Sequence, residues 1–152
     1  MSSFIGDYPC KIDAKGRIAL PSAFIKQLAS VTTELRDKFV LRKDIFEKCL
    51  VLYSIGEWER QNEIIRNKLN PYNKEHSLFL RGFYKDTAEL CMDANNRILV
   101  PKRLLEIAEI ENDVVLAGQD KKIEIWAKSK YENSTPNDDA FAELAQKILG
   151  NY

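Results

Sequence analysis

Short alternations of apolar and polar residues recur along the chain and predict β-strands with one buried and one exposed face. In residues 17–20, Ile18 and Leu20 fall on one side, and Ile98 and Val100 do the same in residues 97–100. We expect these four side chains in the core. The predicted strands occupy residues 9–13, 17–20, 39–42, 50–53, 88–93, 97–100, 114–117 and 123–126.

Helical spacing of apolar residues predicts what lies between and after these strands. The predicted helices occupy residues 22–29, 56–69, 74–84, 102–108 and 138–149. Asn70 and Pro71 break the second from the third, and residues 133–137 form a linker before the last. The last helix either docks on its own chain or packs on a neighbouring subunit, and the pattern leaves both interpretations open.

The same arrangement occurs twice. Residues 13–17 read DAKGR and residues 93–97 read DANNR, 80 positions later. Residues 49–53 (CLVLY) resemble residues 122–126 (KIEIW), at an offset of 73. The second copy has therefore lost seven residues (80 − 73), most simply from the loop around residues 30–38. Two matches in the same order indicate a duplicated unit.

Each copy contains a tight turn between two strands. The carboxylate of Asp13 or Asp93 is expected to accept backbone N–H groups ahead of it and close an Asx-turn. Gly16 and Asn96 occupy the position that favours a positive φ, which glycine and then asparagine adopt most easily. Arg17 then points away from the core face, as its counterpart does in the second copy.

Neither unit has enough strands to build a core alone. Interleaved about a pseudo-twofold axis, the two could close a small β-barrel and so remove exposed sheet edges. The expected fold class is therefore α+β, a pseudo-twofold small barrel of two interleaved units with short flanking helices.

Composition sets limits on function. The chain has 152 residues, of which 45% are apolar, and 23 basic side chains balance 23 acidic ones. These figures exclude wholesale disorder and a uniformly basic coat for nucleic acid. No apolar run reaches the roughly 20 residues of a membrane helix. The first seven residues lack signal-peptide features, so the chain is expected to stay where it is made, without a membrane partner.

Candidate catalytic and metal-binding residues are few. Cys10, Cys49 and Cys91 are widely spaced and form no CxxC motif, so we expect buried small apolar residues in a reducing compartment and no metal site. His76 is the single histidine and has no obvious partner. P-loop, GxGxxG and GxSxG motifs are absent from the sequence. We therefore expect no enzyme activity and no cofactor.

The two DxxxR segments carry a resemblance. Together with residues 49–53, 57–59, 81–84 and 88–93, they resemble the MraZ family of bacterial regulators, which have two SpoVT/AbrB-type, swapped-hairpin units in one chain. The similarity covers roughly residues 3–132. It divides the chain into a first unit, a helical connector, a second unit, and a linker with a C-terminal helix. These parts span residues 5–60, 61–85, 86–132 and 133–152.

The resemblance implies a cytoplasmic, nucleoid-associated regulator of transcription. Such proteins bind short G-rich direct repeats in the promoter of the division and cell-wall gene cluster and assemble as rings of many subunits. The resemblance assigns DNA contacts to Arg17 and Arg97. The sequence departs from the family pattern at Asn96, where a glycine is usual.

Other residues near the turns leave alternatives open. Lys15 suits a phosphate, whereas Asn95 and Asn96 either contact DNA or cap their turn. Arg17 could instead form an exposed salt bridge to Asp13. Residues 11–17 carry three basic and one acidic side chain, a local charge of +2, and residues 93–103 carry the same.

A protein-interaction module, antitoxin-like or a scaffold, is the competing function. Residues 132–143 hold four acidic side chains and no basic ones, which could favour a protein partner. A small enzyme and an RNA-binding protein rank lower, because no nucleophile–base pairing and no RNP-type aromatic pattern is visible.

Overall fold

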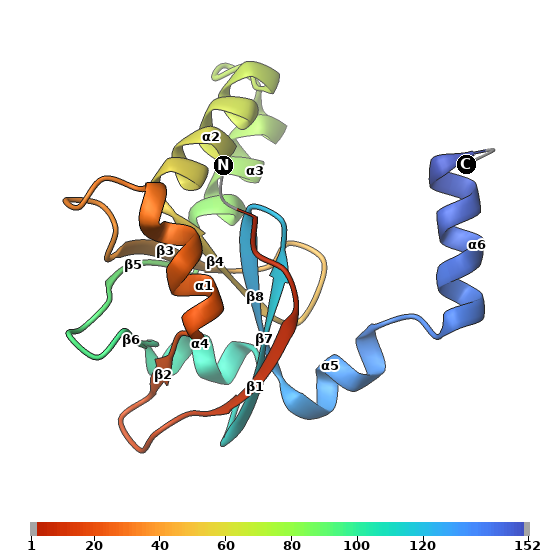
Figure 1. The fold of residues 1–152 in the computed structure, drawn as a ribbon. Coiled ribbons are helices and arrows are strands. Elements are labelled where there is room, and N and C mark those ends of the chain that lie inside the picture. The colour runs from red at the N-terminus through yellow and green to blue at the C-terminus, as the bar shows by residue number, and fades with distance from the viewer. Residues whose placement is uncertain (1–2, 151–152) are drawn as a thin grey trace.

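Residues 3–150 form two antiparallel sheets and seven helical segments (Figure 1). The computed structural model describes residues 3–150. The strands are β1 Asp7–Lys11, β2 Arg17–Ala19, β3 Lys38–Lys43, β4 Leu50–Ser54, β5 Thr87–Cys91, β6 Arg97–Leu99, β7 Asp113–Gln119 and β8 Lys122–Ala127. The helices are α1 Ser22–Gln27, η1 Leu28–Ser30, α2 Ile55–Lys68, α3 Lys74–Tyr84, α4 Lys102–Ile107, α5 Lys128–Ser134 and α6 Asp138–Leu149.

The larger sheet interleaves the two units. Its strand order is β1-β7-β8-β4-β3-β5, so each unit contributes its first strand to the far side of the other unit's hairpin. The order reads the same from both ends when β1, β3 and β4 are exchanged for β5, β7 and β8. The pseudo-twofold axis therefore passes between β4 and β8, where the two units meet.

The smaller sheet exchanges strands in the same way. β2 pairs only with β6 in the described part of the chain, and Ile18 lies directly opposite Ile98 at its centre. Both isoleucines are fully buried, as their alternation predicts. This two-strand pair is called the β2–β6 ribbon below.

The α+β class is confirmed, whereas the barrel is not. β1 and β5 are the outer strands of the larger sheet, and no ladder between residues 3 and 150 joins them. A closed barrel needs such a pairing, because each edge strand must find a partner. The barrel therefore stays a prediction.

One face of the larger sheet carries the main core. Leu50 and Leu52 of β4 and Ile123 and Ile125 of β8 point into it and pack with the buried residues of the ribbon, α1 and α4. Because side chains alternate along a strand, Val51 and its partner Glu124 face the other way. One face of the sheet is thus covered by the apolar core, and the opposite face carries a second, more polar layer of side chains.

Helices α2 and α3 form a hairpin on that second side. Asn73 caps the N-terminus of α3, where its side-chain oxygen accepts the backbone N–H groups of Glu75 and His76 at 2.9 and 3.2 Å. Trp58 of α2 stacks on Phe83 of α3 with ring centroids 5.7 Å apart. His76, for which the sequence showed no partner, accepts the N–H of Asn70 through Nδ1 at 2.8 Å. It therefore helps to close the hairpin loop.

The C-terminal segment extends away from the sheets. α6 has the predicted bounds, yet no residue of this helix is buried, and it stands apart from the rest of the molecule (Figure 1). Docking on its own chain is therefore wrong for this structure. α5 was not predicted and occupies residues 128–134, which overlaps the predicted linker. Residues 151 and 152 of the predicted C-terminal part lie outside the described residues.

The cysteines differ in their surroundings. Cys49 is buried, but Cys10 is half-buried and Cys91 is exposed, so the expectation of three buried thiols is wrong for Cys91. Cys91 ends β5, an edge strand, on its solvent side. Burial raises the pKa of the Cys10 thiol to about 11.

None of the helices within residues 3–150 combines the length and the apolar composition that a membrane-spanning helix needs.

Candidate nucleic-acid interface

The turn between β1 and β2 is closed by its aspartate. Asp13 Oδ1 accepts the backbone N–H groups of Lys15 and Arg17, at 3.0 and 2.8 Å, and its main-chain oxygen accepts that of Gly16 at 3.0 Å. Gly16 has φ of +88°. This is the Asx-turn geometry that the sequence predicts, with the left-handed residue in the expected place.

The second copy repeats this geometry. Asp93 Oδ1 accepts the N–H groups of Asn95 and Arg97, at 2.9 and 3.0 Å. Asn96 has φ of +58° and donates its N–H to Asp93 O at 3.0 Å. The asparagine therefore adopts the conformation that glycine adopts in the first turn.

Each arginine is held by the aspartate of its own turn. Arg17 Nε donates to Asp13 Oδ2 at 2.7 Å, and Arg97 Nε donates to Asp93 Oδ2 at 2.9 Å. The salt bridge considered as an alternative for Arg17 is therefore present. It occupies only Nε, and the terminal nitrogens of both arginines make no hydrogen bond within residues 3–150. The aspartate thus orients the guanidinium and leaves its outer edge open.

The same contacts perturb the aspartates. The backbone N–H of Arg17 lowers the pKa of Asp13, and the Arg17 side chain and the Lys15 N–H act in the same direction. Asp93 has a lowered pKa for the corresponding reasons, with the N–H of Arg97 first. Both carboxylates therefore favour the charged form that the turn requires.

The β2–β6 ribbon brings the two arginines to one surface. Arg17 lies opposite Leu99, and Arg97 lies opposite Ala19, on the face away from the buried isoleucines. Arg17 and Arg97 are thus diagonal neighbours, a relationship that separates residues by roughly 7–8 Å and their Cβ atoms by somewhat less. Both turns project on the side of the molecule opposite α6 (Figure 1).

Sequence reasoning missed Leu99. Its side chain is 54% exposed between the two arginines. The alternation that points Arg97 outward also points Leu99 outward, so the signal was present in residues 97–100. An exposed leucine on a polar surface is a candidate for apolar contact with a partner.

Lys15 and Asn95 occupy equivalent positions in the two turns. Both are exposed, and neither side chain forms a hydrogen bond or ion pair within the part of the chain that the structure describes. Gly16 is buried, and a Cβ there would lie 3.1 Å from the main-chain oxygen of Val100. Asn96 is exposed instead, so its side chain adds to the surface of the second turn.

These features define a class of protein. A protein of this class contains two interleaved copies of one unit. Each copy places on the shared two-stranded ribbon an aspartate-braced arginine, that is, an arginine whose Nε is hydrogen-bonded to the aspartate of its own turn. A family model described as "MraZ protein, putative antitoxin-like" matches residues 3–82 and 83–150. The chain belongs to the MraZ family, which confirms the resemblance found in the sequence.

Similar proteins carry the name "Transcriptional regulator MraZ". One from Bacteroides fragilis is 42% identical over 149 residues, which cover 98% of this chain and 92% of the relative. One from Christiangramia forsetii is 40% identical over 154 residues, covering 99% and 96%. One from Bacteroides thetaiotaomicron is 37% identical over 151 residues, covering 99% and 95%. The name describes regulators and not enzymes, in agreement with the expectation from the sequence.

Proposed function

We propose that this chain binds double-stranded DNA sequence-specifically and regulates transcription. The observation that carries the proposal is the pair of aspartate-braced arginines, Arg17 and Arg97, on one exposed face of the β2–β6 ribbon. Similar proteins over nearly the whole chain are named transcriptional regulators, which supports the same function.

The braced guanidinium suits guanine. Its two terminal nitrogens can donate to O6 and N7 of guanine in the major groove, and such a contact discriminates bases by about 1–3 kcal/mol. A major groove admits a two-stranded β-ribbon. Two arginines at diagonal positions would then reach neighbouring base pairs, which favours G-rich sites. Leu99 between them would contact an apolar base edge such as the thymine methyl group.

The neighbouring turn residues would hold the backbone of the DNA. The Lys15 ammonium is a compact charge without the guanidinium fork and suits a phosphate. Asn95 takes its place in the second turn and offers an amide to a phosphate or a base edge. The two turns would therefore differ in charge, and the first would bind more strongly.

Affinity would come from assembly. One chain offers few DNA contacts and a net charge of zero, so a single chain would bind weakly. A ring of subunits would engage several direct repeats. Because the first contact tethers the others, the overall avidity would rise by about 10² or more. α6 stands apart from the ribbon (Figure 1), so it can join subunits without covering the turns. The sites would be G-rich direct repeats in the promoter of the division and cell-wall gene cluster, in a cytoplasmic, nucleoid-associated protein.

Footprinting on the DNA upstream of the chain's own gene tests this proposal. We expect protected repeats at moderate salt, with affinity falling steeply as the salt concentration is raised or the number of intact repeats is reduced. Arg17→Ala should abolish protection while the variant remains folded. Unchanged protection by folded Arg17→Ala protein would contradict the proposal.

The second candidate is an antitoxin-like or scaffold module that binds a protein. The description of the family model and the acidic stretch around α6, including Asp138 and Asp139, favour it. The two functions separate in one experiment. A scaffold would leave upstream DNA unprotected at every salt concentration tested, whereas the DNA-binding function requires protection.

A further inference from the structure

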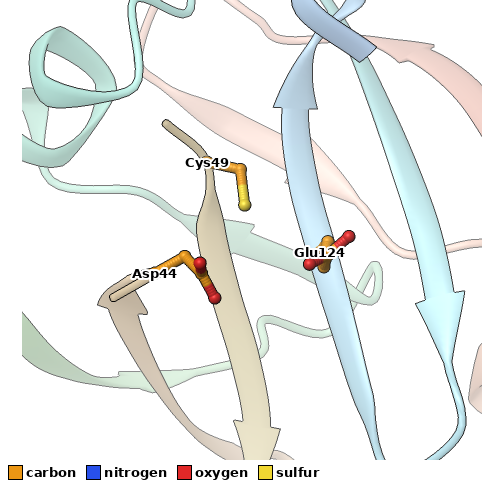
Figure 2. A group of neighbouring side chains, drawn as sticks. All are labelled: Asp44, Cys49 and Glu124. Atoms are coloured by element: carbon orange, nitrogen blue, oxygen red, sulfur yellow. The ribbon is translucent and has the colours of Figure 1, made fainter. Parts of the chain in front are cut away.

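Three side chains that bind metals in other proteins converge on the polar side of the larger sheet (Figure 2). Asp44 follows β3, Cys49 precedes β4, and Glu124 lies on β8. One candidate ligand atom from each lies within 4.8 Å of the other two. The Asp44 N–H donates to Cys49 O at 3.0 Å and closes the β3–β4 loop, so the first two residues are held together by the backbone.

Both carboxylates are anchored through one oxygen. Asp44 Oδ2 accepts the N–H groups of Phe46 and Glu47, at 3.0 and 2.8 Å. Glu124 Oε1 accepts the indole N–H of Trp126 at 3.1 Å. The second oxygen of each carboxylate makes no hydrogen bond within residues 3–150. In metal sites, the carboxylate ligands are typically oriented by hydrogen bonds of this kind, and here one oxygen of each carboxylate is left open to bind an ion.

The thiol of Cys49 is buried and unpartnered. Its exposure is 0%, and no hydrogen bond to it exists among the described residues. Figure 2 shows its sulfur pointing into the space between the carboxylates of Asp44 and Glu124. Burial raises the pKa of this thiol strongly, and the charges of Glu124 and Asp44 raise it further, against a smaller opposite effect of Lys122. A cation between the three groups would reverse this penalty.

We propose that Asp44, Cys49 and Glu124 bind one divalent transition-metal ion, with Zn²⁺ the best fit. A thiolate ligand selects against Mg²⁺ and Ca²⁺, and carboxylates complete the mixed oxygen and sulfur set that Zn²⁺ accepts. On binding, the S–H bond of Cys49 breaks, its proton passes to solvent, and the sulfur bonds to the metal. Three protein ligands leave a fourth, tetrahedral position for water.

The site would join the two units. Asp44 and Cys49 belong to the β3–β4 hairpin of the first unit, and Glu124 belongs to β8 of the second. Bonds of about 2.1 Å for Zn–O and about 2.3 Å for Zn–S require ligand atoms closer together than 4.8 Å, so the three side chains would rotate toward the ion. A bound ion would therefore brace the strand pair that lies on the pseudo-twofold axis.

Cobalt titration of the full, reduced, chelator-treated chain tests the proposal. Co²⁺ bound to a thiolate gives a sulfur-to-metal charge-transfer absorption that carboxylates alone do not give. We expect one Co²⁺ per chain with this absorption, and its loss on addition of Zn²⁺. Cys49→Ser should abolish the absorption. The matched control, Cys91→Ser, removes an exposed cysteine and should leave it unchanged.

Amide variants keep the proposal testable if Cys49→Ser does not fold. Asp44→Asn and Glu124→Gln retain the oxygen that accepts the N–H groups but remove the charged ligand, so each should weaken Co²⁺ binding at least about tenfold. The proposal is wrong if the wild-type chain shows no charge-transfer absorption, if Cys49→Ser retains it, or if both amide variants bind Co²⁺ unchanged. None of these measurements involves DNA, so their outcome is independent of the proposed function.

Discussion

The main-chain oxygen of Gly16 accepts the N–H of Val100 at 2.9 Å, which ties the first turn to the second unit. The reciprocal bond joins the N–H of Leu20 to the main-chain oxygen of Asn96, also at 2.9 Å. Each turn is therefore positioned by the strand that follows the other turn. The two half-buried arginines depend on this exchange for their common orientation.

Replacing Arg17 separates charge from geometry. Arg17→Ala should weaken binding to the upstream repeats by about 1–3 kcal/mol for each guanine that the side chain no longer binds, which a multi-subunit assembly would turn into undetectable binding. Arg17→Lys keeps the charge but removes the fork, so we expect weak binding with little preference among sequences. Gel shifts on matched and mutated repeats measure both effects.

Arg66→Ala is the matched control for Arg17→Ala. Arg66 is an exposed arginine on α2 that also pairs with a carboxylate, that of Glu63 at 3.3 Å. We expect it to bind DNA as the wild type does. An equal loss for Arg66→Ala would show that total charge, and not the braced arginine, determines binding.

Arg97→Ala should weaken DNA binding less than Arg17→Ala. The two arginines are braced alike, but the second turn has Asn95 in place of a lysine and an exposed Asn96 side chain in place of buried Gly16. Asn96→Gly should strengthen binding by removing that side chain. Titrations of the three variants on one repeat array give the ranking, and a larger loss for Arg97→Ala would reverse it.

Gly16→Ala should destabilise the fold by about 1–2 kcal/mol, because a Cβ is disfavoured at positive φ and would lie 3.1 Å from Val100 O. Gly82→Ala is the control with the opposite sign. Gly82 lies in α3 with open space around it, and alanine there should stabilise the chain by up to about 1 kcal/mol. Urea unfolding of both variants measures the difference, and equal effects would contradict it.

Asp13→Asn should remove a contribution to stability that depends on pH. The folded-state pKa of Asp13 is lowered, so its carboxylate stabilises the turn above the unfolded value of about 3.9. That contribution falls as the pH drops through the folded-state pKa. The wild type should therefore be more stable than Asp13→Asn near neutral pH, with the gap closing in acid. Unfolding curves over this range test the sign, and a constant gap would exclude the ionisation of Asp13 as its cause.

The apolar face of α6 should control assembly and not folding. Phe141→Glu and Ile148→Glu change exposed side chains of a helix without buried residues, so thermal stability of the isolated chain should change little. The mass in solution should fall if α6 joins subunits. Gln146→Glu adds a carboxylate away from this face and serves as the control. Light scattering measures the mass, and an unchanged mass in both apolar variants would exclude this role.

Local sequence was sufficient for the turns. The DxxxR spacing predicts the Asx-turns, and glycine or asparagine at the third turn position predicts the positive φ found at Gly16 and Asn96. The repeat also contains a signal for α5. The offset of 73 places the start of α2, Ile55, on Lys128, where α5 begins. The polar composition of residues 133–137 concealed that signal, because it is typical of a linker.

Relationships between distant segments could not be predicted in the same way. Glu124 approaches Cys49 because β8 pairs with β4, and no spacing in the sequence encodes that pairing. No residue of α6 is buried, although its pattern is amphipathic, because its position depends on the surfaces that the assembled sheets present to it. Sequence periodicity reports which face of an element is apolar, but not what covers it.

The exchanged strands have a consequence for how the protein responds to dilution. If the two units were separate chains, each would lack a strand and would have to find its partner by collision, so its integrity would depend on concentration. Joining them through the α2–α3 connector makes the encounter intramolecular, and folding no longer depends on the amount of protein present. It also permits the two turns to accumulate different residues, since a change in one copy is no longer imposed on the other. Gly16 and Asn96, which occupy equivalent positions in the two turns, are an example of such a difference.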